Sequence, residues 1–144
     1  MKFLNGKNYI RYKRNKVNTL TNAKGEKEFL CALLKLMQLR VAKEKAYQEL
    51  VEDFTATYVF QGQKKGAYIV AEFKNNKIYL SKKRLKAWDF RVYFKSEKYL
   101  YKFLLGEDGE YQEAVREQEV EFTGNLNYIR RLTFMAKMTL MPSI

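Results

Sequence analysis

The sequence predicts an α+β (or α/β) domain in which a five-stranded mixed sheet carries its helices on one face. Two observations support this fold class. Apolar residues recur at three- and four-residue steps over residues 26–54, which is the period of an amphipathic helix. From residue 57 onwards, aromatic and β-branched residues alternate with polar ones, which is typical of strands. The predicted order is helix, three strands, then strand, helix, strand and helix, and this order favours helices gathered on one side of a sheet.

The first element is a long helical segment, residues 26–54. Its pattern thins at residues 42–45, so a break into two helices is expected there. Residues 1–24 are basic and rich in Asn and Thr, and they are compatible with an arm, a hairpin or a short helix. We therefore divide the chain into a basic N-terminal extension, residues 1–24, and one domain, residues 25–144. The apolar positions of the helical segment are Phe29, Leu30, Leu33, Leu34, Met37, Val41, Tyr47, Leu50, Val51 and Phe54.

Three strands are then predicted to form a meander, over residues 57–62, 67–74 and 77–81. The stretch QGQKKG supplies the first turn. Two asparagines supply the second, because Asn tolerates left-handed backbone angles. Side chains alternate along a strand, so the middle strand has two distinct faces. One face carries Ile69, Ala71 and Phe73, and the other carries Tyr68, Val70, Glu72 and Lys74.

A basic connection leads to a fourth strand, residues 89–94, and then to a helix. Ser96 is a suitable N-cap for this helix, and Gly106 is a suitable stop. The apolar positions between them recur at helical steps, which predicts that one side of the helix is buried. These positions are Tyr99, Leu100, Phe103 and Leu104.

The last third of the chain begins with an acidic stretch, residues 109–118, that predicts a short helix or a turn. A fifth strand, residues 119–123, ends at Gly124. Asn125 can then cap a final helix. The apolar positions of that helix are Leu126, Ile129, Leu132, Met135 and Ala136.

The composition excludes several classes of function. The chain has 144 residues, 47% of them hydrophobic, which is enough for a core and argues against disorder. It contains no histidine, which excludes a Ser–His–Asp triad, a Cys–His pair and a histidine metal site. A single cysteine, Cys31, cannot form an internal disulfide, and neither a signal peptide nor a membrane-length apolar run is present. We therefore expect a cytoplasmic, non-enzymatic binding protein without a metal or cofactor.

The charge is large and unevenly distributed. The net charge is +12; residues 57–105 carry +9, whereas residues 106–123 carry −6. Such a charge attracts polyanions, either nucleic acid or an anionic membrane, although a solvated basic face explains it equally well. The acidic segment is compatible with a metal site or an acid–base pair, and the alternative is again a solvated face. The densest basic runs contain Lys13, Arg14 and Lys16, and Lys82, Lys83, Arg84 and Lys86.

The segment from about residue 56 to residue 140 resembles the sterol carrier protein 2 family of lipid-binding domains. The strand and turn AYIVAEFKNNK and the strand-helix unit DFRVYFKSEKYLYKFLLG are similar to successive units of that family. They are followed by Ala114, by an alternating strand with Val120 and Phe122, and by Gly124-Asn125 before the last helix. The resemblance implies an apolar cavity between sheet and helices, and a sterol, fatty acid or fatty acyl chain as ligand.

The resemblance also implies which side chains line the cavity, although a filled core is the alternative for each of them. The sheet wall would consist of Ile69, Ala71, Phe73, Phe90, Val92, Phe94, Val120 and Phe122. The helix wall would consist of Leu100, Phe103, Leu104, Ile129, Leu132 and Met135.

Two other functions stay open from the sequence. Basic residues interleaved with aromatics, as in KKRLKAWDFRVYF, suit a nucleic-acid-binding module, although no recognised nucleic-acid motif accompanies them. The resemblance also allows an accessory subunit of a larger enzyme. For a lipid carrier, we expect an anionic membrane to be met by Lys82, Lys83, Arg84 and Lys86, with Trp88 either at the interface or packed in the core. The oligomeric state is not determined by the sequence.

Overall fold

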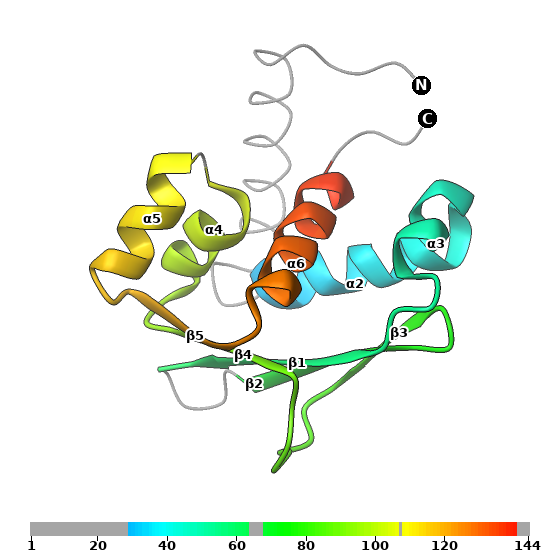
Figure 1. Cartoon of the computed structure of the whole chain (residues 1–144), viewed down its shortest axis with the longest axis horizontal. Helices are drawn as coiled ribbons and strands as arrows, with labels where there is room; N and C mark the ends of the chain where they lie inside the picture. Colours follow the sequence, from blue (N-terminus) through cyan, green and yellow to red (C-terminus); the bar gives the residue numbers. More distant parts are fainter. Residues whose placement is uncertain (1–28, 64–67, 107, 141–144) are drawn as a thin grey trace.

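The computed structural model describes residues 29–63, 68–106 and 108–140. The predicted N-terminal extension, residues 1–24, lies outside the described residues. The described chain forms two layers, a twisted five-stranded sheet and a set of helices that covers one of its faces (Figure 1). The predicted fold class is therefore confirmed.

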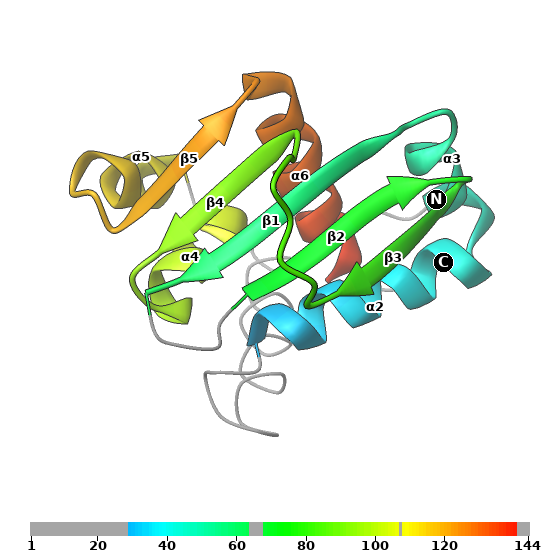
Figure 2. The ribbon, with the colours of Figure 1, turned by 90° about the horizontal axis from the view of Figure 1, so that it is seen from below.

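The sheet has the strand order β3-β2-β1-β4-β5 (Figure 2). Strand β1 is central and pairs in parallel with β4, while the other neighbours are antiparallel, so the sheet is mixed. The predicted strands are all present, with ends shifted by a residue at most. The strands are β1 (Ala56–Gly62), β2 (Tyr68–Lys74), β3 (Lys77–Ser81), β4 (Phe90–Phe94) and β5 (Val120–Gly124).

The helices lie together above the sheet in Figure 1. The first helical segment breaks at Glu44, within the four residues where its pattern thins. The acidic stretch forms a helix rather than a turn. The helices are α2 (Phe29–Lys43), α3 (Lys45–Val51), α4 (Glu97–Leu105), α5 (Asp108–Arg116) and α6 (Leu126–Thr139).

Local chemistry explains several of these boundaries. Asn75 and Asn76 have φ angles of 55° and 59°, as a tight hairpin turn requires. Asn125 caps α6, because its side-chain oxygen accepts a hydrogen bond from the backbone N–H of Asn127 at 2.8 Å. Ser96 occupies the N-cap position of α4, but its side chain makes no capping hydrogen bond. The capping prediction for Ser96 is thus right in position only.

Gly124 is required where β5 turns into α6. Its φ angle is +137°, and a Cβ atom there would lie 2.7 Å from the carbonyl oxygen of Asp89 and 2.7 Å from the ring of Phe90. Only glycine fits this conformation and this close approach. The glycine therefore fixes the direction in which α6 leaves the sheet and crosses the helical layer.

The two faces of the sheet carry different clusters. The main core lies between the sheet and the helices, and it includes Ala71 and Phe73 from β2. A smaller cluster on the opposite face consists of Val59, Tyr68 and Val70, against which Leu85 and Trp88 pack. The alternation predicted for β2 is therefore confirmed. None of the helices in the described part of the chain has the length and apolarity needed to cross a membrane.

Candidate functional site

The sheet residues predicted to line a cavity all lie in the main core, under the helices. Six of them are buried, and Ile69 and Phe122 are half-buried at its margin. The six predicted helix residues, from α4 and α6, are buried in the same core. The structure thus brings both predicted walls together, across the interface between the two layers. Contact of these side chains with a ligand stays a prediction.

Sequence reasoning missed the centre of this interface. Tyr58 and Phe60 of β1 are 1% and 0% exposed and face the helices from the middle strand. The alternation in residues 57–62 could have placed them on one face, but only the strand order shows that β1 is central. The predicted walls also left out the inner face of α2, although its residues, including Leu33 and Met37, had been assigned to the apolar side of a helix.

Tyr58 is the hub of an aromatic cluster. Its ring centroid lies 5.3 Å from that of Phe73 and 5.8 Å from that of Phe90. Its hydroxyl donates a hydrogen bond of 2.8 Å to the carbonyl oxygen of Tyr128, at the start of α6. Burial raises the pKa of this phenol well above its ordinary value, so Tyr58 stays neutral and serves as an anchor for α6.

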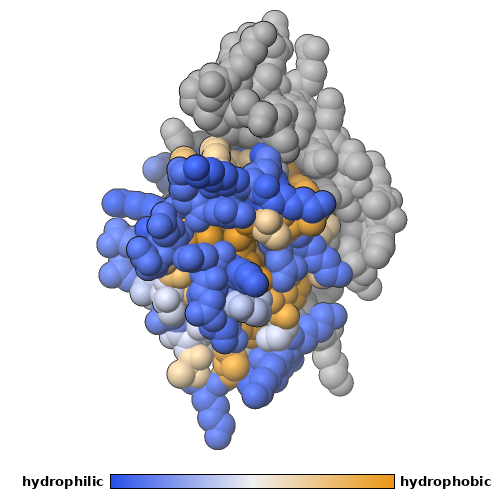
Figure 3. Space-filling view, turned by 90° about the vertical axis from the view of Figure 1, so that its right-hand side faces the viewer, coloured by the Kyte–Doolittle hydropathy of each residue, from blue (hydrophilic) through white to orange (hydrophobic). Residues whose placement is uncertain are grey.

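The aromatic cluster approaches the surface where α3, β1 and α6 meet. Phe54 and Tyr128 are half-buried there, with ring centroids 6.2 Å apart. The Arg131 guanidinium lies 4.2 Å from the centroid of the Phe54 ring and donates a hydrogen bond of 2.9 Å to the carbonyl oxygen of Leu50. Figure 3 shows apolar surface between hydrophilic side chains on the side of the molecule where α3 lies in Figure 1. This margin is the part of the core closest to solvent at the N-terminal end of α6.

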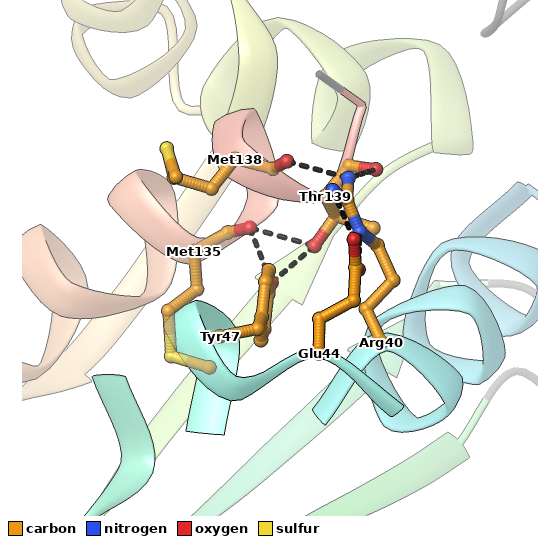
Figure 4. Close-up of polar contacts among 6 residues, drawn as sticks. All are labelled: Arg40, Glu44, Tyr47, Met135, Met138 and Thr139. Carbon is orange, nitrogen blue, oxygen red and sulfur yellow. Dashed lines mark hydrogen bonds and ion pairs between the residues drawn. The ribbon is translucent and has the colours of Figure 1, made fainter. Parts of the chain in front are cut away.

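The C-terminal end of α6 is held by polar contacts instead (Figure 4). Arg40 donates hydrogen bonds to the carbonyl oxygens of Met138 at 2.9 Å and Thr139 at 2.7 Å, and it pairs with Glu44. The Tyr47 hydroxyl bonds to the Met135 carbonyl at 2.7 Å and to the Thr139 hydroxyl. An arginine at this position donates to the last carbonyls of the helix and interacts favourably with the helix dipole.

Comparison with known proteins identifies the architecture. No family model and no curated protein matches the sequence. The structure of the UbiJ-SCP2 ubiquinone synthesis protein matches with a TM-score of 0.57 at 11% identity, over 76% of this chain and 96% of that one. Sterol carrier protein domain 2 of Helicoverpa armigera gives a TM-score of 0.57 at 17% identity, over 82% and 93%. Sterol carrier protein 2 from Yarrowia lipolytica, in its apo form, gives 0.53 at 14% identity, over 74% and 88%.

This chain has the sterol carrier protein 2 fold. The resemblance seen in the sequence is therefore confirmed at the level of the fold. At identities of 11–17%, these matches concern the fold alone.

Within this sterol carrier protein 2 fold, the site offers apolar contact rather than reactive groups. Every buried side-chain nitrogen and oxygen in the described residues has a hydrogen-bond partner. No group of three or more Cys, Asp or Glu residues in the described part of the chain could hold a metal ion. The described interior therefore consists of apolar side chains and of polar groups that are already paired within the protein.

The predicted basic surface lies elsewhere in the fold. Lys82, Lys83, Arg84 and Lys86 are exposed, in the connection between β3 and β4. That connection runs along the sheet face opposite the helices (Figure 1), where the Arg84 guanidinium lies 4.1 Å from the centroid of the Tyr68 ring. Trp88 is half-buried and packs against the small cluster on this face. Of the two positions expected for Trp88, at a membrane interface or packed in the protein, the structure shows the packed one. The loop is separated from the predicted cavity walls by the thickness of the sheet. The other basic run, at residues 13–16, lies outside the described residues.

Proposed function

We propose that this chain binds a lipid or fatty acyl ligand between the helical layer and the sheet, and carries it without chemical change. The observation that carries the proposal is the continuous apolar core into which every predicted wall residue falls. The names of the two sterol carrier proteins with the same fold support a lipid as ligand. The net charge of +12 and the absence of histidine in the sequence are consistent with a carrier that meets anionic surfaces and performs no acid–base catalysis.

The energetics suit such a ligand. Each buried CH₂ contributes about 0.8 kcal/mol, so an acyl chain of about 16 carbons offers on the order of 10 kcal/mol before losses. Loss of ligand freedom removes several kcal/mol, which leaves an affinity of micromolar order. Twelve of the fourteen wall residues are nearly inaccessible to solvent. Entry of the ligand therefore requires part of the helical layer to move from the sheet. We place this opening beside α6, where Phe54 and Tyr128 are half-buried at the margin of the core.

The direct test is native mass spectrometry of freshly purified protein, followed by titration with a fluorescent fatty acid. A bound lipid, or saturable uptake of the probe, is the expected result. Protein that is consistently empty and takes up no probe contradicts the proposal. A gel shift with single-stranded nucleic acid that persists at physiological salt would favour nucleic-acid binding instead.

A substitution at Ala71 separates a cavity from a filled core. Ala71 is fully buried on the helix face of β2, and Ala42 is exposed on α2. In a protein with room for a ligand, Ala71→Leu occupies that room, weakens probe binding and leaves the melting temperature nearly unchanged. In a filled core the added methylenes cost about 1–3 kcal/mol. Ala42→Leu is the matched control and should change neither quantity.

A second function is an accessory role beside an enzyme of lipid metabolism. The observation that favours it is the fold that this chain shares with a protein named for ubiquinone synthesis. The structural match covers 96% of that protein. In this role the chain would present its apolar ligand to a catalytic partner. Affinity purification from the native source should then recover a stoichiometric enzyme, and recovery of the chain without any stoichiometric partner contradicts it.

A further inference from the structure

We infer that the outward face of α6 docks on the surface of an anionic lipid bilayer. This inference rests on the proposed lipid-binding function and names the surface through which the protein would meet its lipid source. It concerns a different element from the basic connection between β3 and β4.

The first observation is the exposure of large apolar side chains on α6. Its inner face is buried in the core, through Ile129, Leu132 and Met135. Leu126 and Phe134 are nevertheless 53% and 52% exposed. They are eight residues apart and therefore lie on one side of the helix, two turns from each other. The helix thus has apolar residues in the core and a second apolar pair that faces solvent.

The second observation is the charge around this pair. Arg130 is exposed midway between Leu126 and Phe134, at the i+4 position of the first and the i−4 position of the second. Arg131 is also exposed, and Lys137 is half-exposed. The fourteen residues of α6 contain no acidic side chain. A helix that combines exposed large apolar residues with only positive charge suits the headgroup region of an anionic bilayer.

The acidic part of the chain does not share this surface. Asp108, Glu110 and Glu113 belong to α5 and Glu121 belongs to β5. Helix α4 lies between α5 and α6 in both Figure 1 and Figure 2. On α4, Lys98 is exposed and Lys102 is half-exposed. The basic charge therefore extends from α6 to α4, and α5 lies on the far side of α4. On the other side of α6, the exposed carboxylates are Glu49 of α3 and Glu52 and Asp53 just after it.

The position of α6 connects docking with loading. One side of the helix covers the core, and the opposite side carries the proposed docking surface. Polar contacts hold it at both ends, through Arg131 and Tyr58 near its start and through Arg40 and Tyr47 near its end. A bilayer bound to the outer side of α6 would therefore lie next to the part of the helical layer where we place the entry of the ligand.

The connection between β3 and β4 provides a competing site, and geometry separates the two. It runs along the opposite face of the sheet (Figure 1), so one flat bilayer cannot contact both surfaces at once. The test is co-sedimentation with vesicles of phosphatidylcholine alone and vesicles that also contain phosphatidylserine, at low and high salt. The wild-type protein should bind the phosphatidylserine vesicles selectively, and high salt should weaken the binding.

Two pairs of substitutions on α6 probe the charge and the apolar side chains. Each basic residue near an anionic surface contributes about fivefold to binding, so Arg130→Gln with Lys137→Gln should weaken vesicle binding roughly 25-fold. Leu126→Ser with Phe134→Ser should weaken it on the order of tenfold or more. Neither pair includes a residue whose side chain anchors α6.

Each pair has a matched control elsewhere on the surface. Lys82→Gln with Lys83→Gln removes the same charge from the opposite sheet face. Leu39→Ser with Tyr79→Ser removes two other exposed apolar side chains, 48% and 41% exposed. Both controls should keep wild-type binding. Equal losses in the controls, or wild-type binding in the α6 variants, overturn the inference.

Two further measurements keep the outcomes distinct. Size-exclusion chromatography that shows a wild-type dimer, dissolved by Phe134→Ser, would identify this face as an interface between two chains and overturn the inference. Uptake of a fluorescent fatty acid in vesicle-free solution should be unchanged in the α6 variants. Vesicle docking without any fatty-acid uptake would contradict the proposed function and support the docking surface, whereas uptake without docking would do the reverse.

Discussion

Replacement of Arg40 by methionine should loosen the C-terminal end of α6. The Arg40 side chain is 13% exposed and donates two hydrogen bonds to the last carbonyls of α6, at 2.9 and 2.7 Å. Hydrogen bonds of a charged donor contribute about 1.5–3 kcal/mol when a carbonyl would otherwise be buried. The Met138 carbonyl, however, keeps a bond from the N–H of Leu140. We therefore expect a loss of about 2–3 kcal/mol in the free energy of unfolding, including the favourable interaction with the helix dipole.

The assay is urea denaturation, with amide hydrogen exchange of α6 as a local readout. A loss of this size lowers the melting temperature by roughly 7–10 °C for a chain of this length. Glu44→Gln is the control, because it keeps the bonds from Arg40 to α6 and removes only a partly exposed ion pair, which contributes about 1 kcal/mol at most. Hydrogen exchange should accelerate at the end of α6 in Arg40→Met and stay unchanged in β1. The reasoning is refuted if Arg40→Met changes stability by less than about 0.5 kcal/mol, or if Glu44→Gln costs as much.

Three further predictions concern pH, backbone strain and fluorescence. Burial raises the pKa of both Tyr47 and Tyr58 above the ordinary 10, so the unfolded chain loses these protons at lower pH than the folded one. The two buried phenols therefore contribute fully to the free energy of unfolding below about pH 10, and this contribution falls as the pH rises above about 10. Replacement of both Tyr47 and Tyr58 by Phe should flatten the decline of the free energy of unfolding, measured by urea denaturation, between about pH 9 and 11. Gly124→Ala should cost about 2–4 kcal/mol in the same assay, because the new methyl group meets the carbonyl oxygen of Asp89 at 2.7 Å; an equally stable variant would contradict the strain. Trp88 is the only tryptophan of the chain and packs on the outer sheet face, so its emission maximum should not move when phosphatidylserine vesicles bind α6; a blue shift would place the basic connection at the bilayer instead.

The local elements could be predicted from the sequence because each depends on nearby residues. The predicted helical period corresponds to α2 and α3 in the part of it that the structure describes, residues 29–54. Its thinning before Lys45, the Asn75-Asn76 turn and the Gly124-Asn125 junction also correspond to observed features. Side-chain alternation was enough to assign the faces of β2, since a strand has only two. The predicted cavity residues fell into one core for the same reason, as the apolar side of each element has to be buried somewhere.

Long-range arrangement was decided by the tertiary structure alone. No local pattern shows that β1 pairs in parallel with β4, and this pairing is what makes Tyr58 and Phe60 the centre of the core. The basic connection was predicted to be exposed, but only the fold places it across the sheet from α6. Leu126 belonged to the apolar pattern of the last helix, yet packing leaves it in solvent. The sequence by itself determines which side chains must leave water, because burial depends on the chemistry of each side chain. Which buried side chains contact one another depends on how the strands pair, and this pairing forms only when distant segments of the chain pack together.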